Sequence, residues 1–341
     1  MRLFPKLSLG AALALGLSPL ALAAQEVTLR LHSFGSPASL DHTAHLDRWA
    51  EQVAADSDGR IAVEVYPSLQ LGGDVADLVP QLEDGIVDIV WTVPGFTPGR
   101  FAGPQGLELP FMNTGHSATM SPAAMEFIET NLAPEFEGIK IISVHATDAA
   151  LVHTKGRPVR TLEDFQGLKL RVAGRFIGEA VKGLGATPVG MGLGDIYEGL
   201  SRGQVDGMLI NWAITQPFRF YEVTDYHTDF PLYQTMLMTL MSQASYDKLP
   251  DDLKAVIDQN SGVEYATRMG GIWDGATQPA RQASIDAGDE IITLSDEEVA
   301  RWKEAVQPAY DAWIAEMDAQ GYDGAALFAS LQAITAKHGR Q

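Results

Sequence analysis

One arginine and one asparagine occupy the ends of two predicted strands in a segment that reads as strand, helix, turn, helix, strand. Arg171 lies in the run Phe165–Val172, and Asn211 follows Gly203–Gly207 by four residues. An Arg on a strand can hold a carboxylate through two parallel hydrogen bonds, which a Lys cannot do. The pair therefore predicts capture of a small organic anion rather than chemistry on it. The alternative for Arg171 is a structural ion pair, and for Asn211 a turn residue at a strand end.

Further candidate ligand contacts are residues near predicted strand ends or in loops, which is where α/β folds bind ligands. They are Trp212, Trp91, Gln70, Phe34, Ser33, Arg100, Phe101 and His153. Packing is the alternative for Trp212 and Trp91, and a satisfied buried histidine is the alternative for His153. Arg100 either supplies a second cation to the ligand or stabilises its own loop through contacts within the protein.

The elements that carry these residues alternate between strand and helix. Alternating apolar residues predict strands at Glu26–His32 and Ile61–Tyr66, and a mostly apolar run predicts a buried strand at Ile86–Trp91. A helix capped by Ser39 and another capped by Asp74 separate them. This alternation indicates an α/β domain, with a long Gly- and Pro-rich loop over residues 92–106.

The second half of the chain adds further elements of both kinds. We expect a helix at Pro122–Leu132, a strand at Ile139–His145 and a short strand at Ile291–Leu294. The aromatic and Met-rich segment 225–243 is predicted to cross back to the first domain. Helices follow from Pro250, one of them beginning at Ser295–Glu298 with acidic residues on the positive end of its dipole.

The composition and the first 24 residues limit the classes of protein to which the chain can belong. Residues 1–24 have a basic start, an apolar middle and small residues at the end, which is typical of a cleaved signal peptide and predicts a periplasmic protein. The apolar run is short for the alternative, a membrane anchor. The chain has 44 acidic against 24 basic residues, so its field repels phosphates and excludes a nucleic-acid partner. It has no Cys.

Motifs for enzymes and cofactors are absent from the sequence. The run Gly190–Gly194 lacks the spacing of a dinucleotide-binding motif. The sequence also contains no P-loop, no zinc-protease motif and no nucleophile-elbow motif of an α/β-hydrolase. The histidines lack the spacing of a zinc site. We therefore expect no catalytic residue, no cofactor and no metal. A secreted hydrolase, the remote alternative, would have to use Ser33 and His42.

Several short motifs, in order, resemble one known family. They are Gly167–Val172, Leu184–Met191 and Gly203–Gly207, supported by Leu71–Gly73, Asp84–Asp88 and Glu108–Met112. From about Val27 to Ala333 the chain is similar to the periplasmic solute-binding subunits of tripartite ATP-independent periplasmic (TRAP) transporters, the DctP-type family.

The resemblance implies two hinged lobes, a ligand cleft between them and a long helix that spans both. It places residues 25–147 plus about 236–274 in lobe I, and 148–235 plus about 275–341 in lobe II. Arg171 is similar to the family's carboxylate-binding arginine, and Asn211 to its usual polar partner. The implied partners are a small organic acid and two membrane subunits, a small four-span and a large twelve-span protein.

The chain departs from the sialic acid and dicarboxylate binders of that family in two places. Those relatives often carry a second Arg in the region that here reads Thr147–Thr154, which has none. Many have Asn-Pro where this chain has Asn211-Trp212. We therefore expect a monocarboxylate with an apolar, aromatic or onium body. The alternatives are a binding protein of an ABC transporter and one linked to a sensor.

Overall fold

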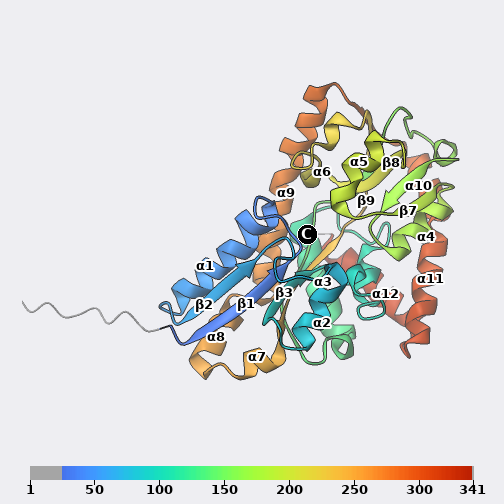
Figure 1. Ribbon diagram of the computed structural model, residues 1–341. Coiled ribbons are helices and arrows are strands. Elements are labelled where there is room, and N and C mark those ends of the chain that lie inside the picture. The colour runs from blue at the N-terminus through green and yellow to red at the C-terminus, as the bar shows by residue number, and fades with distance from the viewer. Residues whose placement is uncertain (1–24, 340–341) are drawn as a thin grey trace, which may run out of the picture.

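The computed structural model describes residues 25–339, and the predicted signal peptide of residues 1–24 lies outside them. The described chain forms two β-sheets with helices packed around them (Figure 1). The strand order is β2-β1-β3-β10-β4 in the first sheet and β11-β9-β5-β8-β6-β7 in the second. We call the parts built around these sheets lobe I and lobe II. The predicted α/β class with two lobes is confirmed.

The strands of lobe I are β1 (Val27–Ser33), β2 (Ile61–Tyr66), β3 (Ile89–Thr92), β4 (Ile139–Ala146) and β10 (Met236–Ser242). Those of lobe II are β5 (Ala150–Thr154), β6 (Lys169–Val172), β7 (Thr187–Gly190), β8 (Gly207–Asn211), β9 (Tyr226–Tyr233) and β11 (Glu290–Ile292). The predicted strands at Ile86–Trp91 and Ile291–Leu294 correspond to β3 and β11, with shifted ends.

The larger helices are η1 (Asp41–Leu46), α1 (Asp47–Asp56), α2 (Leu78–Glu83), α3 (Ser117–Asn131), α4 (Arg175–Gly183), α5 (Ile196–Ser201), α6 (Trp212–Thr215), α7 (Gln243–Asp247), α8 (Asp251–Gln259), α9 (Gly262–Ala287), α10 (Asp296–Ala305), α11 (Gln307–Ala319) and α12 (Gly324–His338). Short 3-10 turns, among them η4 (Pro104–Glu108), connect several of them.

Each sheet has a parallel core whose strands end at the same edge. β1 pairs in parallel with β2 and β3, and β6 pairs in parallel with β7 and β8. β1 runs from the outer end of lobe I towards lobe II (Figure 1). The carboxyl ends of parallel strands are where open α/β sheets bind ligands. In lobe I this edge carries Ser33 and Trp91, and in lobe II it carries Arg171 and Asn211.

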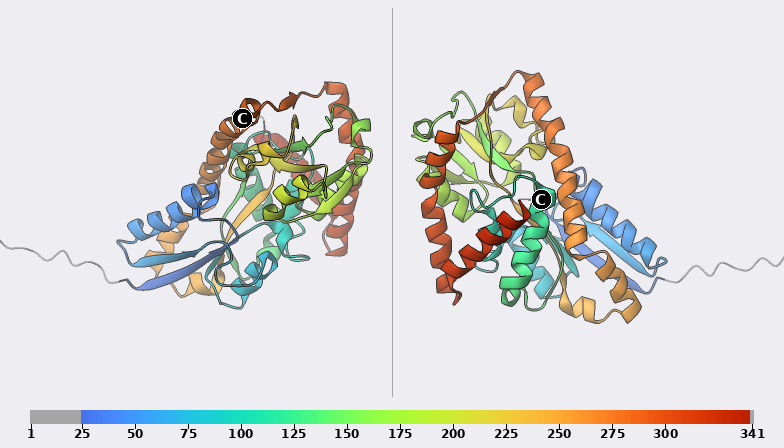
Figure 2. Two further views of the ribbon diagram at one scale, coloured as in Figure 1. Left: turned by 45° about the horizontal axis from the view of Figure 1, so that its top comes forward. Right: turned by 180° about the vertical axis from the view of Figure 1, so that it is seen from behind.

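The chain passes between the sheets three times, and one long helix touches both. It crosses from β4 to β5, returns from β9 to β10, and crosses again between β10 and β11. The return in segment 225–243 was expected, but its two full strands were not. The 26-residue helix α9 packs on α3 and β4 of lobe I and on α6 of lobe II, and Figure 2 shows it running along both lobes. The long spanning helix is thus confirmed.

The C-terminal helices belong to both lobes. α11 packs on α4 of lobe II, whereas α12 packs on α3 of lobe I (Figure 2). The contacts of α12 with α3 thus differ from the expectation that residues 275–341 all pack in lobe II. Two aromatic side chains of α11 attach this helix to the loop that follows β3. The Nε1 of Trp313 donates a hydrogen bond to the carbonyl oxygen of Ala102 at 2.8 Å, and the hydroxyl of Tyr310 donates one to the carbonyl oxygen of Pro110 at 2.7 Å.

The predicted N-cap residues mark the start of two helices correctly but not that of a third. The side chain of Asp74 accepts a bond from the amide of Ala76, and the side chain of Ser295 accepts one from the amide of Glu298, as predicted. Ser39 caps no helix. The helix begins as the π-helical turn η1 at Asp41, which no side chain caps.

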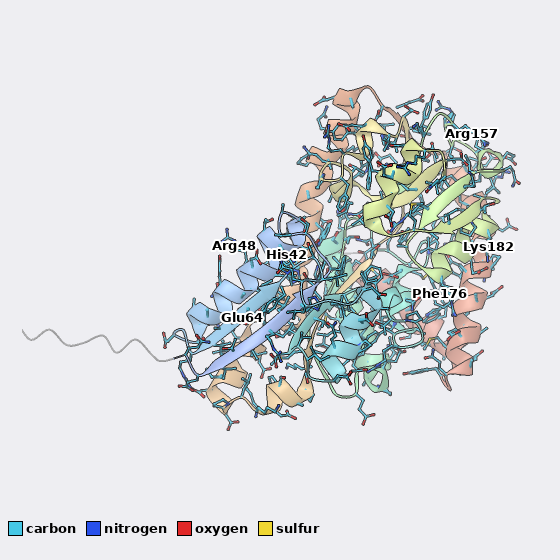
Figure 3. All side chains as sticks on the ribbon, in the orientation of Figure 1. His42, Arg48, Glu64, Arg157, Phe176 and Lys182 are labelled. Carbon is cyan, nitrogen blue, oxygen red and sulfur yellow. The ribbon has the colours of Figure 1, made fainter. Side chains whose placement is uncertain are left out.

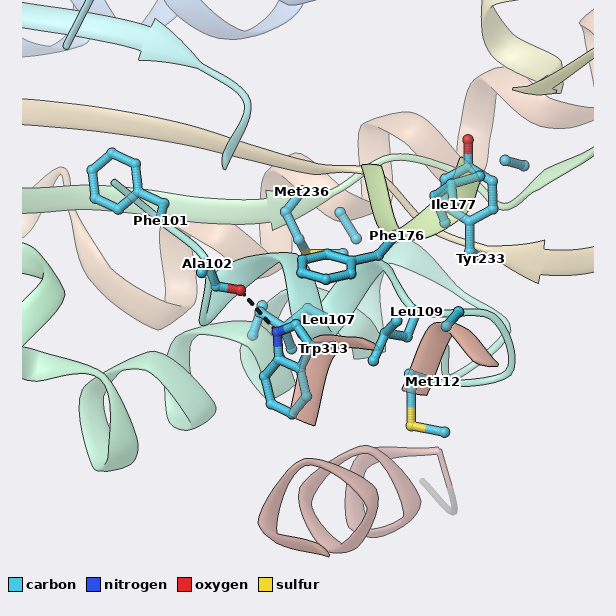
Figure 4. Packing of buried hydrophobic residues seen from close by; sticks show 14 of the residues in the cluster. Phe101, Ala102, Leu107, Leu109, Met112, Phe176, Ile177, Tyr233, Met236 and Trp313 are labelled. Carbon is cyan, nitrogen blue, oxygen red and sulfur yellow. Dashed lines mark hydrogen bonds between the residues drawn. The ribbon is translucent and has the colours of Figure 1, made fainter. Parts of the chain in front are cut away.

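A continuous apolar core lies against the inner faces of both sheets, and Figure 4 shows part of it. It includes Phe101 and Met236 from lobe I and Phe176 and Tyr233 from lobe II. A second apolar cluster lies on the other face of the lobe I sheet, beneath α1, α8 and α9. In the part of the chain from residue 25 to 339, no helix is both long enough and apolar enough to cross a bilayer.

Candidate functional site

Arg171 is a buried cation without an anionic partner. Its residue surface is 6% exposed, and it is the only buried Lys or Arg among residues 25–339. No carboxylate of the described chain forms an ion pair with it, so the structural ion pair considered above does not form there. Burial lowers its pKa, but an arginine stays charged at any physiological pH. A buried charge of this kind needs an anion from elsewhere.

The backbone holds the Arg171 side chain in place. β6 lies between β7 and β8, so Arg171 stands opposite Val189 on one side and Met208 on the other. Its Nε donates to the carbonyl oxygen of Met191 at 2.9 Å. The two terminal nitrogens have no partner among the described residues, which leaves the fork that binds carboxylates available.

The titratable neighbours of Arg171 are neutral. Tyr233, at the end of β9, is close enough for the Arg171 charge to act on it, yet burial raises its pKa to about 12. Glu108 acts on Tyr233 in turn, and burial raises the pKa of Glu108 to about 8, although its Oε1 accepts from the amide of Met236 at 2.9 Å. Both groups are therefore protonated at neutral pH and do not cancel the arginine charge.

Sequence reasoning missed both of these neighbours. Glu108 was part of a motif, but nothing in the motif indicated a buried acid. Tyr233 lies in the aromatic and Met-rich segment 225–243, whose pattern predicts only a crossing between the domains. In Figure 4 its hydroxyl points away from the labelled apolar side chains around Phe176.

Asn211 is anchored by an aspartate at the first crossing between the lobes. The Nδ2 of Asn211 donates to Oδ1 of Asp148, and the amide of Ala213 donates to Oδ2 at 3.0 Å. Burial raises the pKa of Asp148 to about 7. The side-chain oxygen of Asn211 has no partner in the described chain and remains available as an acceptor. No sequence pattern distinguishes Asp148 from the other acidic residues of the chain, so its contact with Asn211 follows only from the structure.

The lobe I edge carries a group of aromatic rings. Phe34 stacks on Trp91 with ring centroids 4.4 Å apart and planes 14° apart, and it meets Phe96 edge-on at 5.0 Å. Trp91 is fully buried, whereas Phe34 is partly exposed. Phe34 touches both apolar clusters. The structure thus brings together two of the predicted contacts, and of the stacked pair Phe34 is the ring that remains partly exposed.

Ser33 belongs to a series of hydrogen-bonded side chains that resembles a catalytic triad, but a substrate cannot reach its hydroxyl. Its Oγ is 2.6 Å from Nε2 of His42, whose Nδ1 is 3.3 Å from Oδ1 of Asp47. Ser33 is fully buried, so its hydroxyl cannot attack an external bond. Figure 3 shows His42 at the end of its helix that lies nearest lobe II.

For three predicted contacts in lobe I, namely Phe101, Arg100 and Gln70, the structure shows surroundings other than those expected. Phe101 is fully buried in the core. Arg100 binds Glu83 and the carbonyl of Glu135, so it ties its loop rather than supplying a second cation. Gln70 is exposed on the surface, and its side chain has no bond in the described chain.

His153 and Trp212 are also packed inside. Nδ1 of His153 lies 2.6 Å from Nδ1 of His227, and its Nε2 lies 3.1 Å from the carbonyl of Ile210. Trp212 packs edge-on against His153 and donates to Asp229 at 3.1 Å. The alternatives of a satisfied histidine and of packing fit these two residues. Residues 25–339 hold no cluster of three or more acidic, His or Cys side chains that could bind a metal.

The sequence matches the model of the family DctP, described as bacterial extracellular solute-binding protein, family 7, over residues 32–316. The chain belongs to the DctP family. It is accordingly a TRAP-type solute-binding protein and not an enzyme, which overturns the hydrolase alternative.

Solved structures and a curated relative agree with this DctP assignment. A TRAP solute-binding protein from an unidentified marine microbe, specific for aromatic acids and bound to metahydroxyphenylacetate, is 38% identical, with a TM-score of 0.87 over 92% of this chain and 99% of that one. One from Rhodoferax ferrireducens with copurified benzoate is 35% identical, with a TM-score of 0.87 over 92% and 98%. The C4-dicarboxylate-binding periplasmic protein DctP of Rhodobacter capsulatus is 26% identical over 82% of this chain and 83% of its own.

Proposed function

We propose that this DctP protein captures an aromatic monocarboxylate in the periplasm and delivers it to the two membrane subunits of a TRAP transporter. The observation that carries the proposal is the buried, unpaired guanidinium of Arg171. The carboxylate of the ligand would take the two terminal nitrogens of Arg171, since this pairing is geometrically matched.

A single acid group fits the distribution of charge. Arg171 is the only buried cation among the described residues, and Arg100 is engaged by Glu83 and Glu135. A second carboxylate would lose its hydration without gaining a cation, which is unfavourable. A monocarboxylate is therefore preferred over a dicarboxylate.

An aromatic body fits the rings of lobe I. Phe34 and Trp91 present a stacked pair, and aromatic rings add favourable stacking to the burial of apolar area. The marine and Rhodoferax relatives, at more than a third identity, hold aromatic acids, which supports the same class here.

The ligand would join the two lobes. We propose that its acid group binds Arg171 and Asn211 in lobe II and its ring binds lobe I, so that binding favours a closed arrangement. Lobe I would comprise residues 25–147 and about 236–274, together with α12, and lobe II most of the rest.

The test is calorimetric titration with benzoate, mandelate and succinate. We expect the two monocarboxylates to bind and succinate to bind at least about 30-fold more weakly, which is the low end of the cost of an unpaired buried charge. Arg171→Gln should weaken benzoate binding roughly 30- to 5,000-fold. Arg175→Gln is the matched control, because Arg175 is exposed and pairs with Glu316. Equal binding by the wild type and Arg171→Gln would refute the proposal.

A further inference from the structure

A row of buried polar side chains crosses the lobe I sheet. Ser33 stands opposite Trp91, Trp91 opposite Thr239, and Thr239 opposite Ser143. Residues that face each other in neighbouring strands point to the same side of the sheet. The four residues therefore form one row, and all of them are buried.

Three more buried polar residues lie next to this row. His45 comes from η1, His145 from β4 and Tyr265 from α9. The ring of His45 lies 4.7 Å from that of His145 and 5.6 Å from that of Tyr265, measured between centroids. Nε2 of His45 is 3.4 Å from the hydroxyl of Thr239. We call the row and these three residues the polar row.

The polar row contains several buried atoms without a hydrogen-bond partner in the described chain. They are the Nε1 of Trp91, both ring nitrogens of His145, the Nδ1 of His45 and the hydroxyl of Tyr265. Each buried polar group left unpaired costs about 1–3 kcal/mol, and native proteins contain few of them. Five such atoms in one place indicate that a polar molecule or group pairs with them.

The chemistry of the polar row suits a neutral group. Burial lowers the pKa of His145 to about 3 and that of His45 well below its usual value, so both rings are neutral. Each neutral imidazole offers one donor and one acceptor, and Trp91 and Tyr265 offer a donor each. A hydroxyl group, which both donates and accepts, complements this set better than an ion does.

The polar row begins where the proposed ligand site lies. Ser33 and Trp91 end their strands at the edge that faces lobe II, and Trp91 stacks on Phe34. Ala213, two residues after Asn211, packs in the same apolar cluster as Trp91 and Tyr265. The polar row therefore includes Trp91, whose stacked partner Phe34 would hold the ligand body, and continues from Trp91 across the sheet through Thr239 to Ser143.

We propose that the polar row is the subsite for a neutral hydroxyl substituent on the ring of the ligand, so that the protein prefers a hydroxylated aromatic acid to the unsubstituted one. This inference rests on the proposed function and adds a specificity determinant in lobe I, opposite the carboxylate clamp in lobe II.

The test compares benzoate with the three isomers of hydroxybenzoate by calorimetry. We expect the best isomer to bind the wild type about 10- to 100-fold more tightly than benzoate, because the hydroxyl pairs groups that benzoate leaves unpaired. In Tyr265→Phe and in His145→Phe this ratio should fall several-fold. Tyr310→Phe is the control, since Tyr310 loses a buried hydroxyl bonded to Pro110 far from the row and should keep the ratio.

The outcomes separate the two proposals. Benzoate bound with no isomer preferred would overturn the subsite alone and leave the polar row filled by water. A preference that both variants retain would overturn the assignment of these residues. If none of the acids binds the wild type, the proposed function fails and the subsite with it. Urea unfolding of each variant confirms that it is folded.

Discussion

The Nε of Arg171 donates to the carbonyl oxygen of Met191 at 2.9 Å. Met191 directly follows β7, the neighbour of β6, so the sheet itself sets the direction of the guanidinium. This bond uses the one nitrogen that a fork-shaped pairing with a carboxylate does not require. The arginine is oriented before any ligand arrives, which lowers the entropy cost of binding.

Replacing Arg171 with lysine should weaken binding of benzoate about 10- to 100-fold although the charge is kept, because an ammonium cannot bind Met191 and both carboxylate oxygens in a planar fork. Calorimetric titration measures the change. Arg175→Lys, on the exposed pair with Glu316, should bind as the wild type does. A lysine variant with unchanged affinity would show that only the charge matters.

Asp148 should be required for the position of Asn211. Asp148→Ala leaves the Nδ2 of Asn211 and the amide of Ala213 without their acceptor, so we expect a loss of about 1–3 kcal/mol in the free energy of unfolding and weaker ligand binding. Urea unfolding and calorimetry measure the two effects. Asp195→Ala, at an exposed residue without a side-chain bond in the described chain, should change neither.

Glu108 should make stability depend on pH. Burial raises its pKa in the folded state to about 8 from the ordinary value of 4.5, so the folded state holds the proton more tightly. The stabilisation is complete below pH 4.5 and is lost as the pH rises towards 8. Relative to Glu108→Gln, which does not titrate, the wild type should lose on the order of 3 kcal/mol between about pH 5 and 8.

The control for Glu108 is an exposed acid with the opposite shift. The Arg301 guanidinium lowers the pKa of Glu163 to about 2, so Glu163 is ionised throughout this range. The difference between the wild type and Glu163→Gln should stay constant with pH. A constant difference for Glu108→Gln as well would mean that Glu108 is ionised in the folded protein.

Two adjacent glycines of α9 should respond in opposite directions to alanine. A Cβ on Gly270 would lie 2.3 Å from the carbonyl oxygen of Ser117 on α3, whereas a Cβ on Gly271 would meet nothing within 4 Å. Gly270→Ala should therefore cost about 1–3 kcal/mol through overpacking of the α3–α9 contact. Gly271→Ala should gain roughly 0.5–1 kcal/mol from helix propensity. Urea unfolding compares them, and equal effects would contradict the close approach.

Local patterns predicted the elements that carry the site. The alternation in Ile61–Tyr66 coincides with β2, and the motifs around Arg171 and Asn211 lie on β6 and β8. These signals work because a strand with one buried face repeats every two residues, and because a strand's end depends on its own turn residues. The same patterns placed Ser33, Phe34 and Trp91 at one edge of one sheet.

Local patterns could not predict which residues of distant strands come into contact. His153 meets His227, 74 residues away, because β9 pairs with β5 in one particular register. Phe101 and Phe34 are similar residues in similar loops, yet one is fully buried in the core and the other is partly exposed. Burial depends on what packs over a residue, and the covering segments lie far along the chain.

The sequence by itself indicated the α/β class and the family, and it singled out the arginine that we propose binds a carboxylate, because periodicity, motif order and the chemistry of a lone arginine are local properties. Only the tertiary structure decided that Arg171 has no ion-pair partner among residues 25–339, that Asp148 holds Asn211, and that Trp91 and the residues near it carry unpaired polar atoms. Each of these depends on strand pairing and on helices folded over the sheet, which fix which side chains share one small volume.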